Sequence, residues 1–171
     1  MSDLTAHAAQ TPLRFERRYE NADIRDLWDL WTTKPGFESW WGPVGFRVEV
    51  HKLEARPGGE LLYDMIAATP EHIEFMRKAN MPISTATRGK FASIAPLQHL
   101  ELVHLIDFVP GQKPYENRIR AEFIREERGA RMVVTVEAHP DPHWTRQTGM
   151  GLESQLTKVP GALAAAGAAR P

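Results

Sequence analysis

The sequence contains no cysteine, and this absence removes several kinds of chemistry at once. A chain without cysteine forms no disulfide bonds and offers no thiolate to a metal or to a substrate. Long apolar runs are also missing, since no stretch approaches the roughly 18 apolar residues that a membrane-spanning helix needs. Residues 1–7 lack the basic start and apolar centre of a signal peptide. We therefore expect a cytoplasmic protein with no membrane insertion.

Neither sign of charge is in excess. The 21 Lys and Arg residues nearly balance the 22 Asp and Glu residues, which gives a net charge of -1. The basic residues do not cluster as they do on nucleic-acid-binding surfaces, so we expect no nucleic-acid partner. A length of 171 residues and an apolar content of 42% favour one globular domain.

Catalytic motifs with a fixed spacing are missing as well. The sequence has no Gly-x-Ser-x-Gly elbow, no phosphate-binding glycine loop and no His-Glu-x-x-His pair. His139, Asp141 and His143 offer nominal metal ligands, but prolines on both sides of Asp141 favour an extended turn in which Asp141 caps a helix. We expect no metal and no cofactor, and these absences favour binding over catalysis.

Aromatic residues, in contrast, are concentrated just before residue 44. Pro35 ends one helix and begins a second short one, because its ring disfavours the α region for the preceding residue and suits a first helical turn. The second turn carries Phe37, Trp40 and Trp41, which are too apolar for a solvated loop. Alternating apolar residues follow from residue 44. This pattern predicts two short helices that cover the mouth of a sheet with aromatic rings.

The rest of the chain reads mainly as strands. A first strand is expected from Leu13, and Asn21 is expected to cap the helix that follows. Further strands are expected at 44–55, 60–66, 87–94, 99–108, 117–126 and 131–138. Thr69 and Pro70 begin a helical insertion of about ten residues between two of these strands.

One long helix is expected at the C-terminal end of the chain. It begins at Pro142, and Pro160 should kink or fray its last turns because proline removes an internal hydrogen bond. Residues 1–12 and 164–171 are expected to be loose tails. A mostly antiparallel sheet with helices on one face predicts the α+β class. A sheet that curls around the last helix would enclose a cavity.

Four stretches resemble a known family. The pattern Trp-Thr-x7-Trp-Trp-Gly-Pro at 31–43 looks like the START-like superfamily, also called SRPBCC or the polyketide cyclase and lipid-transport superfamily. Residues 53–59, 88–100 and 150–156 resemble, in order and spacing, the branch of homologues of the heat-shock chaperone ATPase activator. The resemblance covers 13–163.

This resemblance implies a helix-grip fold, in which a curved antiparallel sheet of about seven strands wraps a long C-terminal helix around an apolar pocket. Leu152 stands where the branch usually has tryptophan, which implies a wider pocket floor. The insertion that begins at Pro70 is longer than the hairpin of many members. The resemblance does not imply chaperone activation, because members with only this domain lack the separate docking domain.

Several residues are candidates for ligand contacts, because they combine apolar bulk with a few polar groups in strands or near the expected opening. They are Trp40, Trp41, His51, Tyr63, Met65, Phe75, Met76, His104 and Leu152. The tryptophan rings form either a pocket rim or the packing of the short helices on the sheet. Methionine adapts to varied apolar shapes and would suit a lid at 70–81, although ordinary packing of the insertion on the sheet edge explains these residues slightly better.

His104 shares one strand face with Leu100 and Leu102, which places an imidazole among apolar neighbours. Such a histidine is either a hydrogen-bonded core residue or, where it meets water, an acid or base near neutral pH. Arg118 and Glu122 lie on the opposite parity from the apolar residues of their strand, as in a solvated face. They are weaker catalytic candidates than His104.

These observations favour a protein that binds a small hydrophobic or aromatic molecule for carriage, sequestration or sensing. An enzyme similar to the cyclases and dehydratases of the superfamily is the first alternative. A protein-binding module is the second, and exposed rings at Trp40 and Trp41 are its only support in the sequence. A homodimer through a sheet edge or the aromatic turn is compatible with each.

Overall fold

The computed structural model describes residues 11–169, and its strands form a single antiparallel sheet. The strands are β1 (Leu13–Glu20), β2 (Phe46–Leu53), β3 (Glu60–Ala67), β4 (Ser84–Ala95), β5 (His99–Ile106), β6 (Tyr115–Glu126) and β7 (Gly129–Val136). Their order across the sheet is β1-β7-β6-β5-β4-β3-β2, so β2 to β7 pair in chain order and β1 pairs with β7 at the opposite edge from β2. The predicted tail at 1–12 lies almost entirely outside the described residues.

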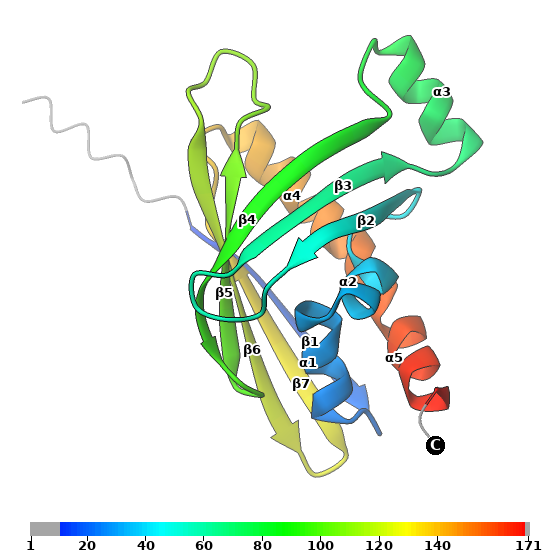
Figure 1. The fold of residues 1–171 in the computed structure, drawn as a ribbon, viewed down its shortest axis with the longest axis vertical. Coiled ribbons are helices and arrows are strands. Elements are labelled where there is room, and N and C mark those ends of the chain that lie inside the picture. Colours follow the sequence, from blue (N-terminus) through cyan, green and yellow to red (C-terminus); the bar gives the residue numbers. More distant parts are fainter. Residues whose placement is uncertain (1–10, 170–171) are drawn as a thin grey trace, which may run out of the picture.

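Within residues 11–169, five helices accompany the sheet: α1 (Ile24–Thr32), α2 (Lys34–Trp40), α3 (Pro70–Lys78), α4 (Pro142–Leu156) and α5 (Val159–Ala168). The sheet curls into a half-barrel, and α1, α2, α4 and α5 lie on its concave side (Figure 1). This arrangement confirms the predicted α+β class and the helix-grip fold. No helix in the described part of the chain is long and apolar enough to cross a membrane.

The start of α1 differs from the prediction. Asp23, and not Asn21, is the N-cap, and its side chain accepts a hydrogen bond from the backbone amide of Arg25 at 2.8 Å. Asn21 instead adopts a left-handed conformation with φ of 62° in the turn after β1. Asparagine tolerates this conformation better than most residues, so the same polar side chain suits either position in the sequence.

Thr33 joins α1 to α2 by serving both helices. It is the C-cap of α1 and the N-cap of α2, where its hydroxyl accepts a hydrogen bond from the amide of Gly36 at 3.1 Å. Pro35 lies in the first turn of α2, as predicted, where its missing amide proton costs no hydrogen bond. The two helices therefore follow each other without a loop.

Aromatic rings hold this helix pair on the sheet. Trp31, Phe37 and Trp40 are completely or almost completely buried. The ring centroid of Trp31 is 5.0 Å from that of Trp40 and 5.5 Å from that of Trp41, in edge-to-face geometry. The indole nitrogen of Trp40 donates to the carbonyl of Leu30 at 2.8 Å. Both adjacent tryptophans therefore pack inward, and the expected exposure of these rings to a protein partner is wrong.

The helical insertion has the predicted start. Thr69 caps α3, its hydroxyl accepts from the amide of His72 at 3.3 Å, and Pro70 follows in the first turn. The helix lies at the far end of β3 and β4, away from the rest of the molecule (Figure 1). Only Met76 of this helix is fully buried, whereas Phe75 is 63% exposed.

The C-terminal region consists of two helices where one long helix was expected. Asp141 caps α4 with Pro142 in the first turn, as predicted. The helix ends at Leu156, and α5 begins at Val159 and continues to Ala168, although residues from 164 onward were predicted to be a loose tail. Pro160 falls in the first turn of α5, a position that tolerates proline. The break before Pro160 thus replaces the expected kink.

The contact between α1 and α2 predicts the effect of a small substitution. A Cβ atom at Gly36 would lie 2.1 Å from the carbonyl oxygen of Asp29, which belongs to the backbone of α1. Gly36→Ala should therefore lower the free energy of unfolding by about 1–3 kcal/mol, because α2 must move away from α1. Urea denaturation measures this change.

Gly161→Ala is the matched control, because a Cβ atom there meets no atom within 4 Å on α5. This variant should gain about 0.5–1 kcal/mol from the higher helix propensity of alanine. Equal stabilities of the two variants would contradict the proposed clash between α1 and α2.

Candidate functional site

Three side chains from distant parts of the sequence form a buried hydrogen-bonded chain. The indole nitrogen of Trp41 donates to the hydroxyl of Tyr63 at 3.0 Å, and this hydroxyl lies 3.0 Å from Nε2 of His104. All three residues are buried. Trp41 directly follows α2, Tyr63 belongs to β3 and His104 to β5. The chain thus links the aromatic helices to the inner face of the sheet.

A glycine on β4 makes this contact across the sheet feasible. β4 lies between β3 and β5, and its Gly89 pairs with His104. A Cβ atom at Gly89 would lie 3.5 Å from Cδ2 of the His104 ring and 2.9 Å from the carbonyl oxygen of Val103. A larger residue would therefore crowd the imidazole. The missing side chain leaves room for Tyr63 and His104 to meet above β4.

Burial keeps both titratable members of the chain neutral. It lowers the pKa of His104 from 6.5 to about 4, because the charged imidazolium is poorly solvated there. Burial also raises the pKa of Tyr63, although hydrogen bonds from Trp41 and Thr87 oppose the shift. At neutral pH, His104 is therefore a neutral hydrogen-bonding ring and a weak base. Its ring stacks on Trp41 with a centroid distance of 6.0 Å and an interplanar angle of 12°.

A second buried histidine connects the sheet to α4. Nδ1 of His139 lies 2.6 Å from the hydroxyl of Tyr115, and Nε2 lies 2.9 Å from the hydroxyl of Thr148. Both ring nitrogens are thus engaged by hydroxyl groups, and His139 links the first half of α4 to β6.

The part of the chain that the structure describes contains no group of three or more His, Cys, Asp or Glu residues able to hold a metal ion.

Gln155 of α4 is a buried polar residue that was not among the predicted site residues. Its Oε1 accepts a hydrogen bond from the amide of Gly42 at 3.2 Å. Its Nε2 is buried and has no hydrogen-bond partner among the described residues. The only signal in the sequence was its position three residues after Leu152, on the same side of the helix.

The other candidate residues lie in three different environments. Trp40 and Leu152 are buried in the core, and Met65 is half-buried on the same face of β3 as Tyr63. Within α3, the side chain of Met76 is buried and that of the neighbouring Phe75 is exposed. His51 is exposed and lies 2.9 Å from the carboxylate of Asp64.

Arg118 and Glu122 belong to the outer face of the sheet. Arg118 pairs with Glu101, and Arg120 pairs with both Glu101 and Glu122 at 2.9 Å. These residues alternate with the buried Ile119 and Ala121 of β6. A catalytic role inside the half-barrel does not fit this placement. These ion pairs agree with the prediction that Arg118 and Glu122 lie on a solvated face of their strand.

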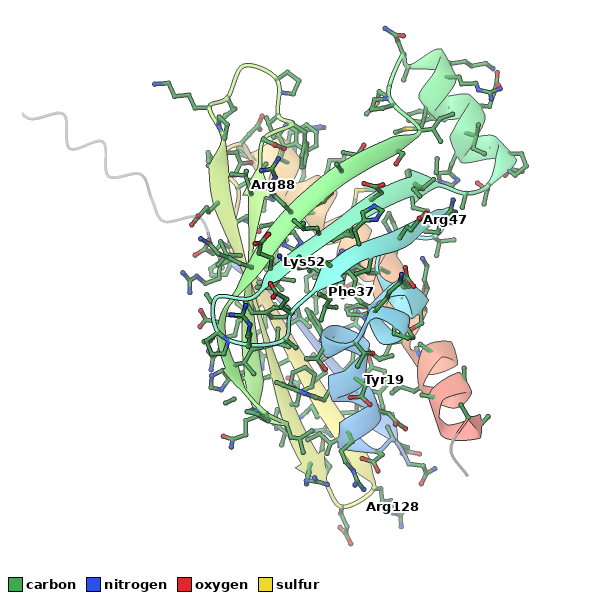
Figure 2. The ribbon with its side chains drawn as sticks, viewed as in Figure 1. Tyr19, Phe37, Arg47, Lys52, Arg88 and Arg128 are labelled. Carbon is green, nitrogen blue, oxygen red and sulfur yellow. The ribbon has the colours of Figure 1, made fainter. Side chains whose placement is uncertain are left out.

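Two clefts on the described surface lie away from the Trp41–Tyr63–His104 chain. A cleft of ≈ 480 Å³ lies between the β1–α1 turn and α5, and a shallower one of ≈ 280 Å³ is lined by Glu71, His72 and Phe75. Neither lies between the sheet and α4. The space between the sheet and the helices α1 and α2 is filled by the buried rings of Trp31, Phe37 and Trp40. Phe37 is labelled in Figure 2. The predicted internal cavity stays a prediction.

The low pKa of His104 predicts how stability depends on pH. The unfolded chain binds a proton near pH 6.5, whereas folded His104 does so only near pH 4. The unfolded state therefore binds more protons between these values, and the free energy of unfolding falls as the pH is lowered. The contribution of His104 is about 3 kcal/mol. His104→Gln should remove most of this contribution in urea titrations read by tryptophan fluorescence.

His143→Gln is the control for this measurement, because the ring of His143 is exposed on the first turn of α4. This variant should lose free energy of unfolding at low pH to the same extent as the wild type. Burial also lowers the pKa of His139, so a smaller acid-dependent loss should persist in His104→Gln. An identical pH profile for wild type and His104→Gln would contradict the burial of a neutral imidazole.

The profile of the family described as Activator of Hsp90 ATPase homolog 1-like protein matches residues 21–163. No match is found among the curated proteins.

Solved structures with the same fold come from several bacteria. A protein from Chromobacterium violaceum has a TM-score of 0.73 at 18% identity, and the match covers 90% of this chain and 96% of that one. An AHSA1 protein from Silicibacter pomeroyi has a TM-score of 0.69 at 18% identity, with 90% and 98% covered. A protein from Nitrosomonas europaea has a TM-score of 0.68 at 18% identity, with 94% and 98% covered.

At such low identity the structural matches show a shared fold and no more. The family profile covers most of the 171 residues, including α1, α2 and the buried hydrogen-bonded chain. It also agrees with the resemblance in the sequence motifs. The chain therefore belongs to the family of Activator of Hsp90 ATPase homolog 1-like proteins, within the START-like superfamily.

Proposed function

We propose that this protein binds a small, mainly apolar molecule between α4 and the inner face of the sheet, beside Trp41, Tyr63 and His104. The buried hydrogen-bonded chain of these three residues is the observation that supports the proposal most directly. The family and the fold support either ligand binding or a role like that of the ATPase activators. The chemistry of the inner face favours ligand binding.

A polar atom beside the buried chain is available to a ligand. Nε2 of Gln155 is buried and has no hydrogen-bond partner within residues 11–169, and Nε2 of His104 bonds to Tyr63. Buried polar groups are usually hydrogen-bonded, so unpaired ones mark places where a bound molecule could supply the partner. Both side chains lie next to the Trp41–Gly42 segment, since His104 stacks on Trp41 and Gln155 bonds to Gly42. A ligand there would meet polar groups from two walls.

The packing of α4 indicates where this ligand would fit. No residue from Pro142 to Met150, the first part of α4, is fully buried, although Trp144 and Thr148 are half-buried. The helix passes behind the upper parts of β2, β3 and β4 (Figure 1). Apolar contact with these elements would supply the affinity, at about 25 cal/mol for each Å² removed from water. The polar atoms would set the orientation.

The two alternatives have weaker support. A histidine with a pKa of about 4 is a poor general base at neutral pH, which disfavours a cyclase or dehydratase mechanism that depends on His104. Trp40 and Trp41 are buried, which removes the exposed rings that pointed to a protein-binding surface. Carriage, sequestration or sensing of the bound molecule remains the favoured role.

A ligand panel tests the proposal. Hydrophobic dyes, fatty acids and hydroxylated aromatic ketones are titrated into the protein, and binding is followed by quenching of tryptophan fluorescence. For a bound aromatic ketone, His104→Leu and Tyr63→Phe should each weaken affinity about tenfold, as expected for the loss of one buried hydrogen bond to the ligand.

His51→Gln is the matched control, because His51 is exposed on the outer face of β2. It should bind like the wild type. Failure of every panel member to bind, or equal affinity in His104→Leu, Tyr63→Phe and His51→Gln, would overturn the proposal.

The weak packing of α3 supports the proposal that residues 70–81 form a lid. Met76 is its only fully buried residue, so movement of the helix would expose little apolar surface. Ligand binding should slow amide hydrogen exchange in this segment, because closure would protect it. The hairpin of β6 and β7 serves as the internal reference. Unchanged exchange in α3 with a saturating ligand would refute the lid.

A further inference from the structure

We propose that the cleft between the β1–α1 turn and α5 is a second binding site, for an organic ammonium ion with a compact apolar body. The cleft has a volume of ≈ 480 Å³, a size typical of small-molecule sites. It shares none of its lining residues with the Trp41–Tyr63–His104 chain. This site therefore goes beyond the proposed function and is independent of it.

One wall of the cleft is apolar. It is formed by α5 through Pro160, Leu163, Ala164 and Gly167. Leu163 is half-buried and the other three are exposed, so the wall offers apolar surface that a ligand could cover. Small side chains along this helix allow a flat or compact hydrocarbon group to approach closely.

The opposite wall carries negative charge. Glu20, Asp23 and Asp26 line it, and Arg18 is the one basic residue among the lining residues. Arg18 already pairs with Glu126 at 3.4 Å, and Asp23 is engaged as the cap of α1. Glu20 has no ion-pair partner within the described residues and is exposed. Its carboxylate is thus available to a cation.

The end of α5 adds to this preference. Gly167, which lines the cleft, lies in the last turn of α5, where the carbonyl groups point toward the C-terminal end of the helix. The C-terminal end of a helix carries partial negative charge, and no basic residue occupies the last turn of α5. A cation in the cleft would therefore interact favourably with the helix end as well as with Glu20.

Tyr19 provides independent support for a ligand site in this cleft. Its side chain is only 9% exposed, and its hydroxyl has no hydrogen-bond partner among the described residues. Tyr19 lines the cleft and lies between α1 and α5 (Figure 2). Burial raises the pKa of Tyr19 to about 12, so the phenol stays neutral and its oxygen can accept a hydrogen bond from an ammonium group. The face of its ring also attracts cations.

An organic cation fits these features better than a metal ion does. The described residues include no group of three or more possible metal ligands, and one whole wall of the cleft is apolar. A molecule with an ammonium group at one end and a hydrocarbon group at the other matches both walls. Aryl-alkyl amines are the simplest members of this class.

Isothermal titration calorimetry at low ionic strength tests the site with 2-phenylethylamine and its neutral analogue 2-phenylethanol. The amine should bind at least tenfold more tightly than the alcohol, because only the amine carries a positive charge. Glu20→Gln should weaken amine binding roughly fivefold, the effect of losing one exposed ion pair. Tyr19→Phe should weaken it at least threefold by removing the hydroxyl.

Two control variants separate this site from others. Glu116→Gln removes an exposed carboxylate on β6 and should bind the amine like the wild type. His104→Leu should also leave amine binding unchanged, which distinguishes this site from the proposed inner one. Tyr19→Phe should unfold no more readily than the wild type, because it removes a hydroxyl that has no partner.

Four outcomes would overturn the proposal. They are the absence of amine binding, equal affinity for amine and alcohol, unchanged affinity in both Glu20→Gln and Tyr19→Phe, and loss of binding in His104→Leu. The last of these would assign the amine to the inner face of the sheet.

Discussion

The packing of aromatic rings between the short helices and the sheet is the constraint on which the rest of the structure depends. Trp31 contacts Trp40 and Trp41 edge to face, and these contacts fix α1 and α2 over the concave side. This packing turns the ring of Trp41 inward, and its indole N–H can therefore donate a hydrogen bond to the hydroxyl of Tyr63. The position of His104, on the other side of Tyr63, follows in turn. The same rings that exclude water from the core therefore place the polar atoms of the candidate site.

Much of the fold was predictable, because its signals are local. Alternating apolar residues located all seven strands, and Thr69, Pro70, Asp141 and Pro142 fixed the starts of two helices. The boundary between α4 and α5 was not predictable in the same way, since proline suits the first turn of a helix as well as it disrupts a later one. Asn21 posed a similar ambiguity, because asparagine favours both N-caps and left-handed turns.

The candidate site was predictable only as a set of residue types. Trp41, Tyr63 and His104 were all named from the sequence, but nothing in the sequence indicated that they bond to one another across β4. That contact depends on strand order and on the absence of a side chain at Gly89. Arg118 and Glu122 illustrate the converse, since their parity placed them outside and the ion pairs with Glu101 and Arg120 keep them there. Gln155 was missed because a glutamine on a helix carries no pattern of its own.

The division of the C-terminal region into α4 and α5 gives the two helices different attachments. α4 is held to the sheet by His139 and by the ion pair of Arg17 with Glu153 at 2.6 Å. α5 packs instead on α1 and α2 through Val159 and Ala162. Thr157 and Lys158 separate the two helices, and Nζ of Lys158 donates to the carbonyls of Pro43 and Phe46. An unbroken helix would have to follow one straight axis across the concave side, whereas two helices can each follow the surface that they cover.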